Sequence, residues 1–136
     1  MATSHPENKR LLIVDDDPAM REGLEELLRH QGYLVLTAAD GTEGLRAVHD
    51  ESPDLVILDV AMPGLDGFHV ATLIKKDPTV NRIPIVLYSG CLEESVALLA
   101  HETQADYFLP KTANVRPILT AIRELLETAP DARSAV

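Results

Sequence analysis

The sequence predicts an α/β protein with a single domain: a doubly wound, five-stranded parallel sheet, (βα)5, in which a helix follows each strand. Two observations support this prediction. Short apolar runs alternate five times with segments whose apolar residues recur at helical spacing. The third run, Leu55 to Leu58, is apolar throughout, which is typical of a parallel strand covered by helices on both faces.

The first half of the chain is predicted to contain strand 11–14, helix 18–31, strand 33–38 and helix 42–50. The first helix has Pro18 in its first turn, where proline is tolerated, and Gly32 at its end. A stripe of apolar residues runs along one side of it. The second helix ends at Ser52-Pro53, because the residue before a proline avoids helical geometry.

The second half is predicted to contain strand 55–59, helix 68–76, strand 83–88, helix 93–103, strand 106–109 and a final helix. Residues 63–67 form a turn before the third helix, which Asp77-Pro78 ends. The fourth helix has only a poor apolar stripe of Leu92, Val96 and Leu99, because Leu98 is apolar as well. Asn114 is expected to cap the final helix, whose apolar residues recur at 3.6-residue spacing.

Composition excludes several classes of protein. The 136 residues fit one domain, expected at 10–128 between a disordered or frayed segment (1–9) and a C-terminal tail (129–136). The net charge of −10 argues against direct binding of nucleic acid or anionic membranes. No apolar run suits a membrane span, and the polar start does not suit a secretory signal. With a single cysteine, Cys91, these features predict a cytoplasmic protein.

Polar residues gather where the predicted strands end. They are Asp15, Asp16, Asp17, Asp59, Ser89 and Lys111. Right-handed crossovers place these strand ends at one edge of the sheet, where Asp17 also suits the cap of the first helix. Clustered carboxylates repel one another, and a hard cation such as Mg²⁺ or Mn²⁺ relieves that repulsion. Because a lysine and a hydroxyl complete the coordination of a phosphoryl group, this edge is predicted to place one on or near Asp59.

Four blocks of the sequence resemble the receiver domain of two-component response regulators, the CheY-like family. They are LLIVDDDP (11–18), LDVAMPGLDG (58–67), YSG (88–90) and ADYFLPK (105–111). The blocks occur in the family's order on the expected strand ends, and the resemblance extends over residues 10–128. It implies a flavodoxin-like sheet with strand order 2-1-3-4-5.

The resemblance also implies a role for each residue of the acidic edge. Asp59 is similar to the phosphoacceptor, which takes its phosphoryl group from a sensor histidine kinase or a phosphotransfer protein. Asp16, Asp59 and the backbone carbonyl of Ala61 would ligate Mg²⁺, or alternatively Mn²⁺. Asp15 would lie nearby or act through a water molecule.

The same resemblance implies a switch. Lys111 would contact the phosphoryl group, and the Ser89 hydroxyl would move onto it. Phe108 lies where the family keeps an aromatic whose burial follows that movement, and Tyr107 is an alternative. The shift would repack the face formed by the fourth helix, the fifth strand and the fifth helix, and a downstream protein would read it. The protein is expected to be a monomer or a weak, phosphorylation-dependent dimer.

Two departures from the family pattern affect these expectations. Thr112 follows Lys111, where many members have a proline. Two positions that flank the attacking water in the family carry the small side chains of Ala61 and Cys91. Because neither is expected to hold that water well, we expect a long-lived phosphoryl group.

Other functions stay open at this point. In a haloacid dehalogenase-like phosphotransferase, Asp15 would carry the phosphoryl group and Asp59 would have no role. In a pseudo-receiver, the domain would bind partners without being phosphorylated. We expect a receiver that catalyses at most its own phosphotransfer and slow autodephosphorylation. The expected form is a stand-alone response regulator, the alternative being a domain excised from a longer protein.

Overall fold

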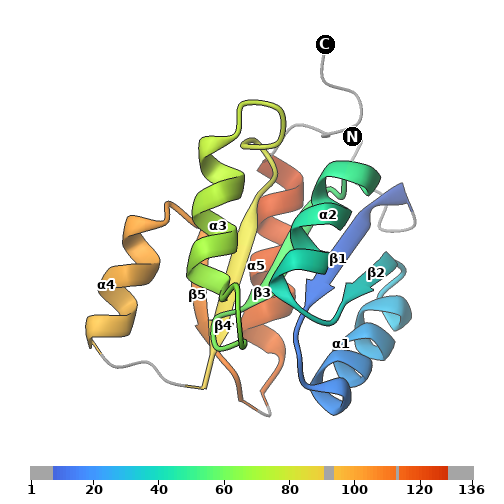
Figure 1. The fold of residues 1–136 in the computed structure, drawn as a ribbon. Helices are drawn as coiled ribbons and strands as arrows, with labels where there is room; N and C mark the ends of the chain where they lie inside the picture. The colour runs from blue at the N-terminus through green and yellow to red at the C-terminus, as the bar shows by residue number, and fades with distance from the viewer. Residues whose placement is uncertain (1–7, 91–93, 113, 129–136) are drawn as a thin grey trace.

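The computed structural model describes residues 8–90, 94–112 and 114–128, without the side chains of Glu94 and Ser95. One parallel sheet has the predicted strand order β2-β1-β3-β4-β5 (Figure 1). Its strands are β1 (Arg10–Val14), β2 (Leu34–Ala38), β3 (Leu55–Asp59), β4 (Ile85–Ser89) and β5 (Tyr107–Pro110). The helices are α1 (Pro18–His30), α2 (Gly41–Glu51), α3 (Gly67–Lys76), α4 (Glu94–Glu102) and α5 (Arg116–Thr128). The predictions for residues 1–7, Cys91 and the tail 129–136 lie outside the described residues.

The helix and strand boundaries lie within one or two residues of the predicted ones, and two of the differences have a local structural cause. β4 begins at Ile85 rather than at residue 83, because the Ile83 N–H closes a turn onto the Val80 carbonyl (3.0 Å) and proline follows it. α5 begins at Arg116, one residue later than predicted. Asn114 still satisfies the start of the helix, since its Oδ1 accepts the Arg116 N–H at 3.1 Å.

The sheet separates two apolar cores because successive strand residues face opposite sides. The α1–α5 core packs α1 and α5 against one face of the sheet, and the α2–α3 core packs α2 and α3 against the other (Figure 1). Ile13 and Ile57 belong to the first core, and Val14 and Leu58 to the second. This alternation decides which side chains at the strand ends share a face.

The described residues contain no helix that is both long and apolar enough to span a bilayer.

α4 packs less tightly than the other helices. Leu98 and Leu99 are 60% and 49% exposed, respectively. Leu99 of the predicted stripe is therefore half-exposed rather than packed inward, and Leu92 lies outside the described residues. Among the described side chains of this helix, Ala100 is the buried one. With a small side chain as its anchor, α4 has little apolar burial to hold it in place.

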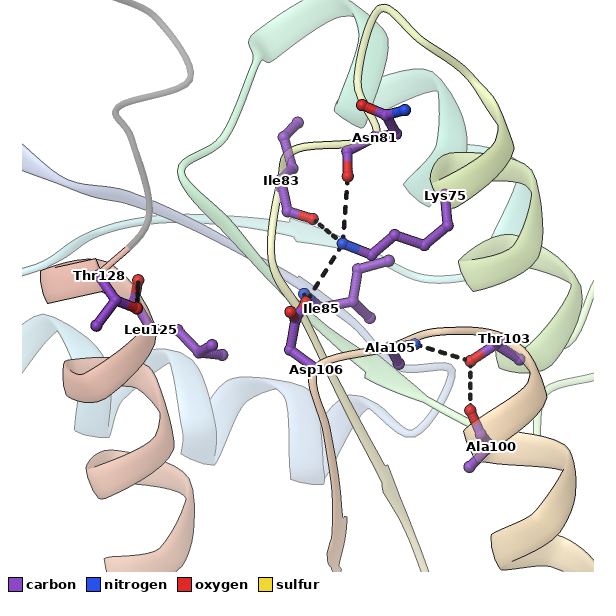
Figure 2. Close-up of polar contacts among 10 residues, drawn as sticks. All are labelled: Lys75, Asn81, Ile83, Ile85, Ala100, Thr103, Ala105, Asp106, Leu125 and Thr128. Atoms are coloured by element: carbon purple, nitrogen blue, oxygen red, sulfur yellow. Dashed lines mark hydrogen bonds and ion pairs between the residues drawn. The ribbon is translucent and has the colours of Figure 1, made fainter.

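At the end of the sheet where the strands begin, Lys75 connects α3 to the start of β4 and to the residue before β5 (Figure 2). Its Nζ donates to the carbonyls of Ile83 (3.0 Å) and Asn81 (3.3 Å). It also lies 3.3 Å from Asp106 Oδ2, which accepts the Ile85 N–H at 2.8 Å. These contacts connect the end of α3 to the start of β4 and to the residue before β5.

His49 provides a pH-dependent contact between α2 and the segment after α3. Its Nδ1 lies 3.0 Å from the Leu45 carbonyl and its Nε2 lies 2.8 Å from Asp77 Oδ2. Both partners are acceptors, so the doubly protonated imidazolium satisfies both. The hydrogen bond to Asp77 raises the pKa of His49, and hydrogen bonds from His49 and Thr79 lower the pKa of Asp77 to about 2.

A histidine pKa that is raised by folding contributes stability at low pH and loses it as the pH rises through the folded value. We expect wild type to lose about 0.5 kcal/mol, relative to His49→Gln, between about pH 5 and about pH 8. Urea unfolding of both proteins at the two pH values measures this difference. Parallel pH dependences for the two proteins would contradict the proposed charge state.

Candidate functional site

Strand alternation brings four polar side chains onto the same face of the sheet at its carboxyl edge. Asp15 directly follows β1, two residues after Ile13, and Asp59 ends β3. Tyr88 pairs with Asp59 in the parallel register, and Lys111 directly follows β5. Each continues the side of its strand that packs into the α1–α5 core.

Three carboxylates converge at this edge, as predicted. One oxygen from each of Asp15, Asp16 and Asp59 lies within 4.8 Å of the others. Asp15 and Asp59 are 0% and 2% exposed, whereas Asp16 is exposed. An all-oxygen donor set that is open to water on one side fits Mg²⁺, which uses one or two carboxylates and keeps several waters. Among the described residues, this is the cluster whose chemistry fits a hard cation.

Lys111 bridges two of the acids. Its Nζ lies 3.1 Å from Asp59 Oδ1 and 3.3 Å from Asp15 Oδ2. The Lys111 N–H donates to the Ser89 carbonyl at 2.8 Å, which attaches the end of β5 to the end of β4. Burial acts to lower the pKa of Lys111, but Asp59 and Asp15 outweigh it and raise that pKa above its usual value. The ammonium therefore stays charged beside Asp59.

The Asp59 carboxyl ionises at a higher pH than an ordinary aspartate. Burial raises its pKa from 3.8 to about 6, with a further contribution from the negative charge of Asp15 and opposition from Lys111. A carboxyl whose pKa is raised by folding ionises more easily in the unfolded chain. The folded protein therefore loses stability as the pH rises from about 4 to about 6.

Without divalent cations, Asp59→Asn is expected to be more stable than wild type at about pH 7.5, by about 1 to 2 kcal/mol. The difference should vanish below about pH 3, where Asp59 is protonated in both folded and unfolded chains. Urea unfolding in a chelator across this range measures it. A variant that is less stable than wild type at neutral pH would show that the Asp59 charge is well accommodated.

Asp15 is held by donors from its own chain. Its Oδ1 accepts the Asp17 N–H at 2.9 Å, and its Oδ2 accepts a hydrogen bond from the Tyr88 hydroxyl. Arg21 donates to the Asp15 backbone carbonyl at 2.8 Å. Asp17 itself caps α1, as predicted, by accepting the Ala19 N–H at 3.1 Å.

Tyr88 belongs to the YSG block (88–90), but the sequence motifs assigned it no role at this site. It is fully buried, and the Lys111 ammonium lies 4.9 Å from its ring centroid. The signal that could have found it is its place one residue before Ser89 and on the same face of the sheet as Asp59.

The two aromatic candidates on β5 face opposite sides of the sheet. Phe108 packs against the α2–α3 core, which includes Ala100 of α4. Tyr107 packs on the other side, and its hydroxyl donates to Glu124 Oε1 of α5 at 2.5 Å. This placement favours Phe108 as the aromatic that would respond to a movement near α4.

The remaining predicted residues also lie at the carboxyl edge. Ser89 is buried at the end of β4, opposite Pro110 of β5. Ala61 is exposed, and its N–H donates to Asp59 Oδ1 at 3.3 Å. This hydrogen bond curls the start of the loop after β3 around the carboxylate.

Gly67 lets α3 begin directly against the backbone of Asp59. A Cβ at this position would lie 2.2 Å from the Asp59 carbonyl oxygen, which is well inside contact distance. The Gly67 N–H donates to the Val60 carbonyl at 3.0 Å. Only glycine permits this approach, so the turn predicted over residues 63–67 fixes the position of Asp59.

Comparison with known proteins agrees with this geometry. The sequence model of the response regulator receiver domain matches residues 11–123. The transcriptional regulatory protein AfsQ1 of Streptomyces coelicolor is 36% identical over 116 residues, covering 85% of this chain and 50% of AfsQ1. The chain thus spans about half the length of the curated relatives it matches.

Solved structures show the same fold. The response regulator TrrA of Thermotoga maritima, crystallised in complex with Mg²⁺-BeF, has a TM-score of 0.79 and 35% identity. That match covers 86% of this chain and 98% of TrrA. The receiver domain of a signal transduction histidine kinase from Syntrophus aciditrophicus has a TM-score of 0.85 and 28% identity, covering 94% and 97% of the two chains.

Proposed function

Because the chain belongs to the response regulator receiver domain family, we propose that it is a signalling receiver switched by phosphorylation of Asp59. One observation carries the proposal. Asp59 is a buried carboxylate at a strand end, 3.1 Å from a lysine ammonium and grouped with two further acids. This arrangement suits a nucleophile that accepts a group carrying two or more negative charges.

The phosphoryl donor is proposed to be the phosphohistidine of a sensor histidine kinase or of a phosphotransfer protein. An Asp59 carboxylate oxygen attacks the phosphorus as the phosphorus–nitrogen bond breaks. The bonding electron pair returns to the imidazole ring, and Asp59 becomes an acyl phosphate. Lys111 stays beside the reacting oxygens and offsets the added charge.

Asp16, Asp59 and the backbone carbonyl of Ala61 are proposed to hold Mg²⁺, with Mn²⁺ as a substitute, and Asp15 acts through water. When bound, the cation neutralises charge on the phosphoryl oxygens. The fit rests on the oxygen-only donor set and on the exposure of Asp16, which leaves space for water ligands. Lys111 lies beside Asp15 and Asp59 and offsets part of their negative charge.

The signal is proposed to leave through the face formed by α4, β5 and α5. A phosphoryl group on Asp59 attracts the Ser89 hydroxyl and the Lys111 ammonium, and β4 carries Ser89 directly into the segment before α4. The exposed leucines of α4 support this proposal, because little apolar burial would oppose a movement of the helix. Phe108 packs on the α2–α3 side of the sheet, against the core that contains Ala100 of α4, and would respond to a movement of that helix.

The output is also a proposal. A downstream protein is expected to read the switched face, either as a separate partner or as a further part of the same chain. Stand-alone action, the absence of direct nucleic-acid contact and a cytoplasmic location remain predictions. AfsQ1, which is named a transcriptional regulatory protein, is about twice as long as the matched region.

Incubation with acetyl phosphate and Mg²⁺, followed by peptide mapping, tests the proposal. Label on Asp59 supports it, and rapid loss of that label would contradict the expected long lifetime. Label on Asp15 would favour a haloacid dehalogenase-like phosphotransferase. An inert Asp59, together with no stabilisation by Mg²⁺, would indicate a pseudo-receiver.

A further inference from the structure

We propose that Tyr88 sets the metal selectivity of the carboxylate cluster formed by Asp15, Asp16 and Asp59, and thereby favours Mg²⁺ over Ca²⁺. The inference rests on the cation site of the proposed function and assigns a positioning role to a hydroxyl outside the proposed ligand set.

The Tyr88 hydroxyl reaches the carboxylate cluster from its buried side. The side chain is fully buried, and its ring belongs to the α1–α5 core. A phenylalanine would fill the same apolar space, so packing alone gives no reason for the oxygen. Its hydroxyl donates to Asp15 Oδ2, and the Lys111 ammonium lies 4.9 Å from the ring centroid.

Each oxygen of Asp15 has a partner from the chain. Oδ1 accepts the Asp17 N–H at 2.9 Å, and Oδ2 accepts the Tyr88 hydroxyl while lying 3.3 Å from Lys111 Nζ. Asp16, by contrast, is exposed. Asp15 therefore contributes its charge to the site, while its hydrogen bonds keep its oxygens turned toward donors of the chain.

The number of available carboxylates distinguishes the two cations. Mg²⁺ takes six ligands in tight octahedral geometry and keeps several waters, whereas Ca²⁺ takes six to eight oxygens and benefits from each additional carboxylate. Restraining Asp15 leaves Asp16 and Asp59 as direct carboxylate ligands, a number that suits Mg²⁺. Removing the Tyr88 hydroxyl frees one side of Asp15 Oδ2 to turn toward the cation, which benefits Ca²⁺ more.

The test compares dissociation constants for MgCl₂ and CaCl₂ in wild type, Tyr88→Phe and Tyr33→Phe, by titration calorimetry at constant ionic strength without a phosphoryl donor. In Tyr88→Phe, the ratio of the Ca²⁺ constant to the Mg²⁺ constant is expected to fall about fivefold. Tyr33 packs against the same core away from the acids, so Tyr33→Phe should keep the wild-type ratio. Melting curves verify that each variant is folded.

A second comparison assigns the effect to Asp15. In an Asp15→Asn background, adding Tyr88→Phe should change the ratio much less, because a neutral amide oxygen attracts a cation more weakly than a carboxylate does. An unchanged ratio in Tyr88→Phe, or an equal fall in the Asp15→Asn background, would overturn the role of Tyr88. Wild type that binds neither cation would instead overturn the cation site of the proposed function.

Discussion

Asp59→Asn is expected to abolish phosphorylation by acetyl phosphate in the presence of Mg²⁺, lowering the rate at least about 10³-fold. The substitution keeps the shape of the side chain but replaces a carboxylate oxygen with an amide nitrogen. The amide is a poor nucleophile, and it also removes one of the two carboxylates proposed to contact the cation directly. The mass of the intact protein after incubation reports whether a phosphoryl group has been added.

The matched control for this experiment is Asp50→Asn, which makes the same chemical change at an exposed position of α2. It should be phosphorylated as fast as wild type. The urea unfolding of Asp59→Asn without cations provides an independent check that the variant is folded. A folded variant that is not labelled has lost the phosphoacceptor and not its structure. Labelling of Asp59→Asn at the wild-type rate would exclude Asp59 as the phosphoacceptor.

Much of the fold follows from local patterns in the sequence. Continuous apolar runs identified the buried parallel strands, and residues such as Pro18 and Gly32 marked helix ends. The sequence placed the start of β4 two residues too early because Ile83 is apolar and buried, like a strand residue. Only the structure shows that its N–H closes a turn before Pro84.

The composition of the acidic edge was predictable, but its internal organisation was not. Strand ends in a parallel sheet share an edge, which predicted that Asp15, Asp16 and Asp59 converge. Residue type and spacing alone do not distinguish Asp15 from Asp16, to which only the family resemblance gave different roles, whereas the structure buries the first and exposes the second. Tyr88 looked like an ordinary strand aromatic, because its hydrogen bond depends on the register between distant strands.

Lys111→Met is expected to destabilise the protein by about 2 kcal/mol in the absence of divalent cations. The ammonium lies 3.1 Å from Asp59 Oδ1 and 3.3 Å from Asp15 Oδ2. Without it, two buried carboxylates face each other with their mutual repulsion unbalanced. Lys111 also acts to lower the pKa of Asp59, so its loss should raise that pKa further and reduce the ionised fraction at neutral pH.

Mg²⁺ distinguishes this electrostatic explanation from a loss of packing. A bound cation replaces the positive charge that the variant lacks, and it stabilises the folded state in proportion to its affinity. Saturating Mg²⁺ should therefore stabilise Lys111→Met more than wild type in urea unfolding. Lys76→Met, at an exposed position in the last turn of α3, should change little in either condition. A Lys111→Met protein that is as stable as wild type in a chelator would mean that water or other groups already balance the two acids. The lysine would then serve the phosphoryl group alone.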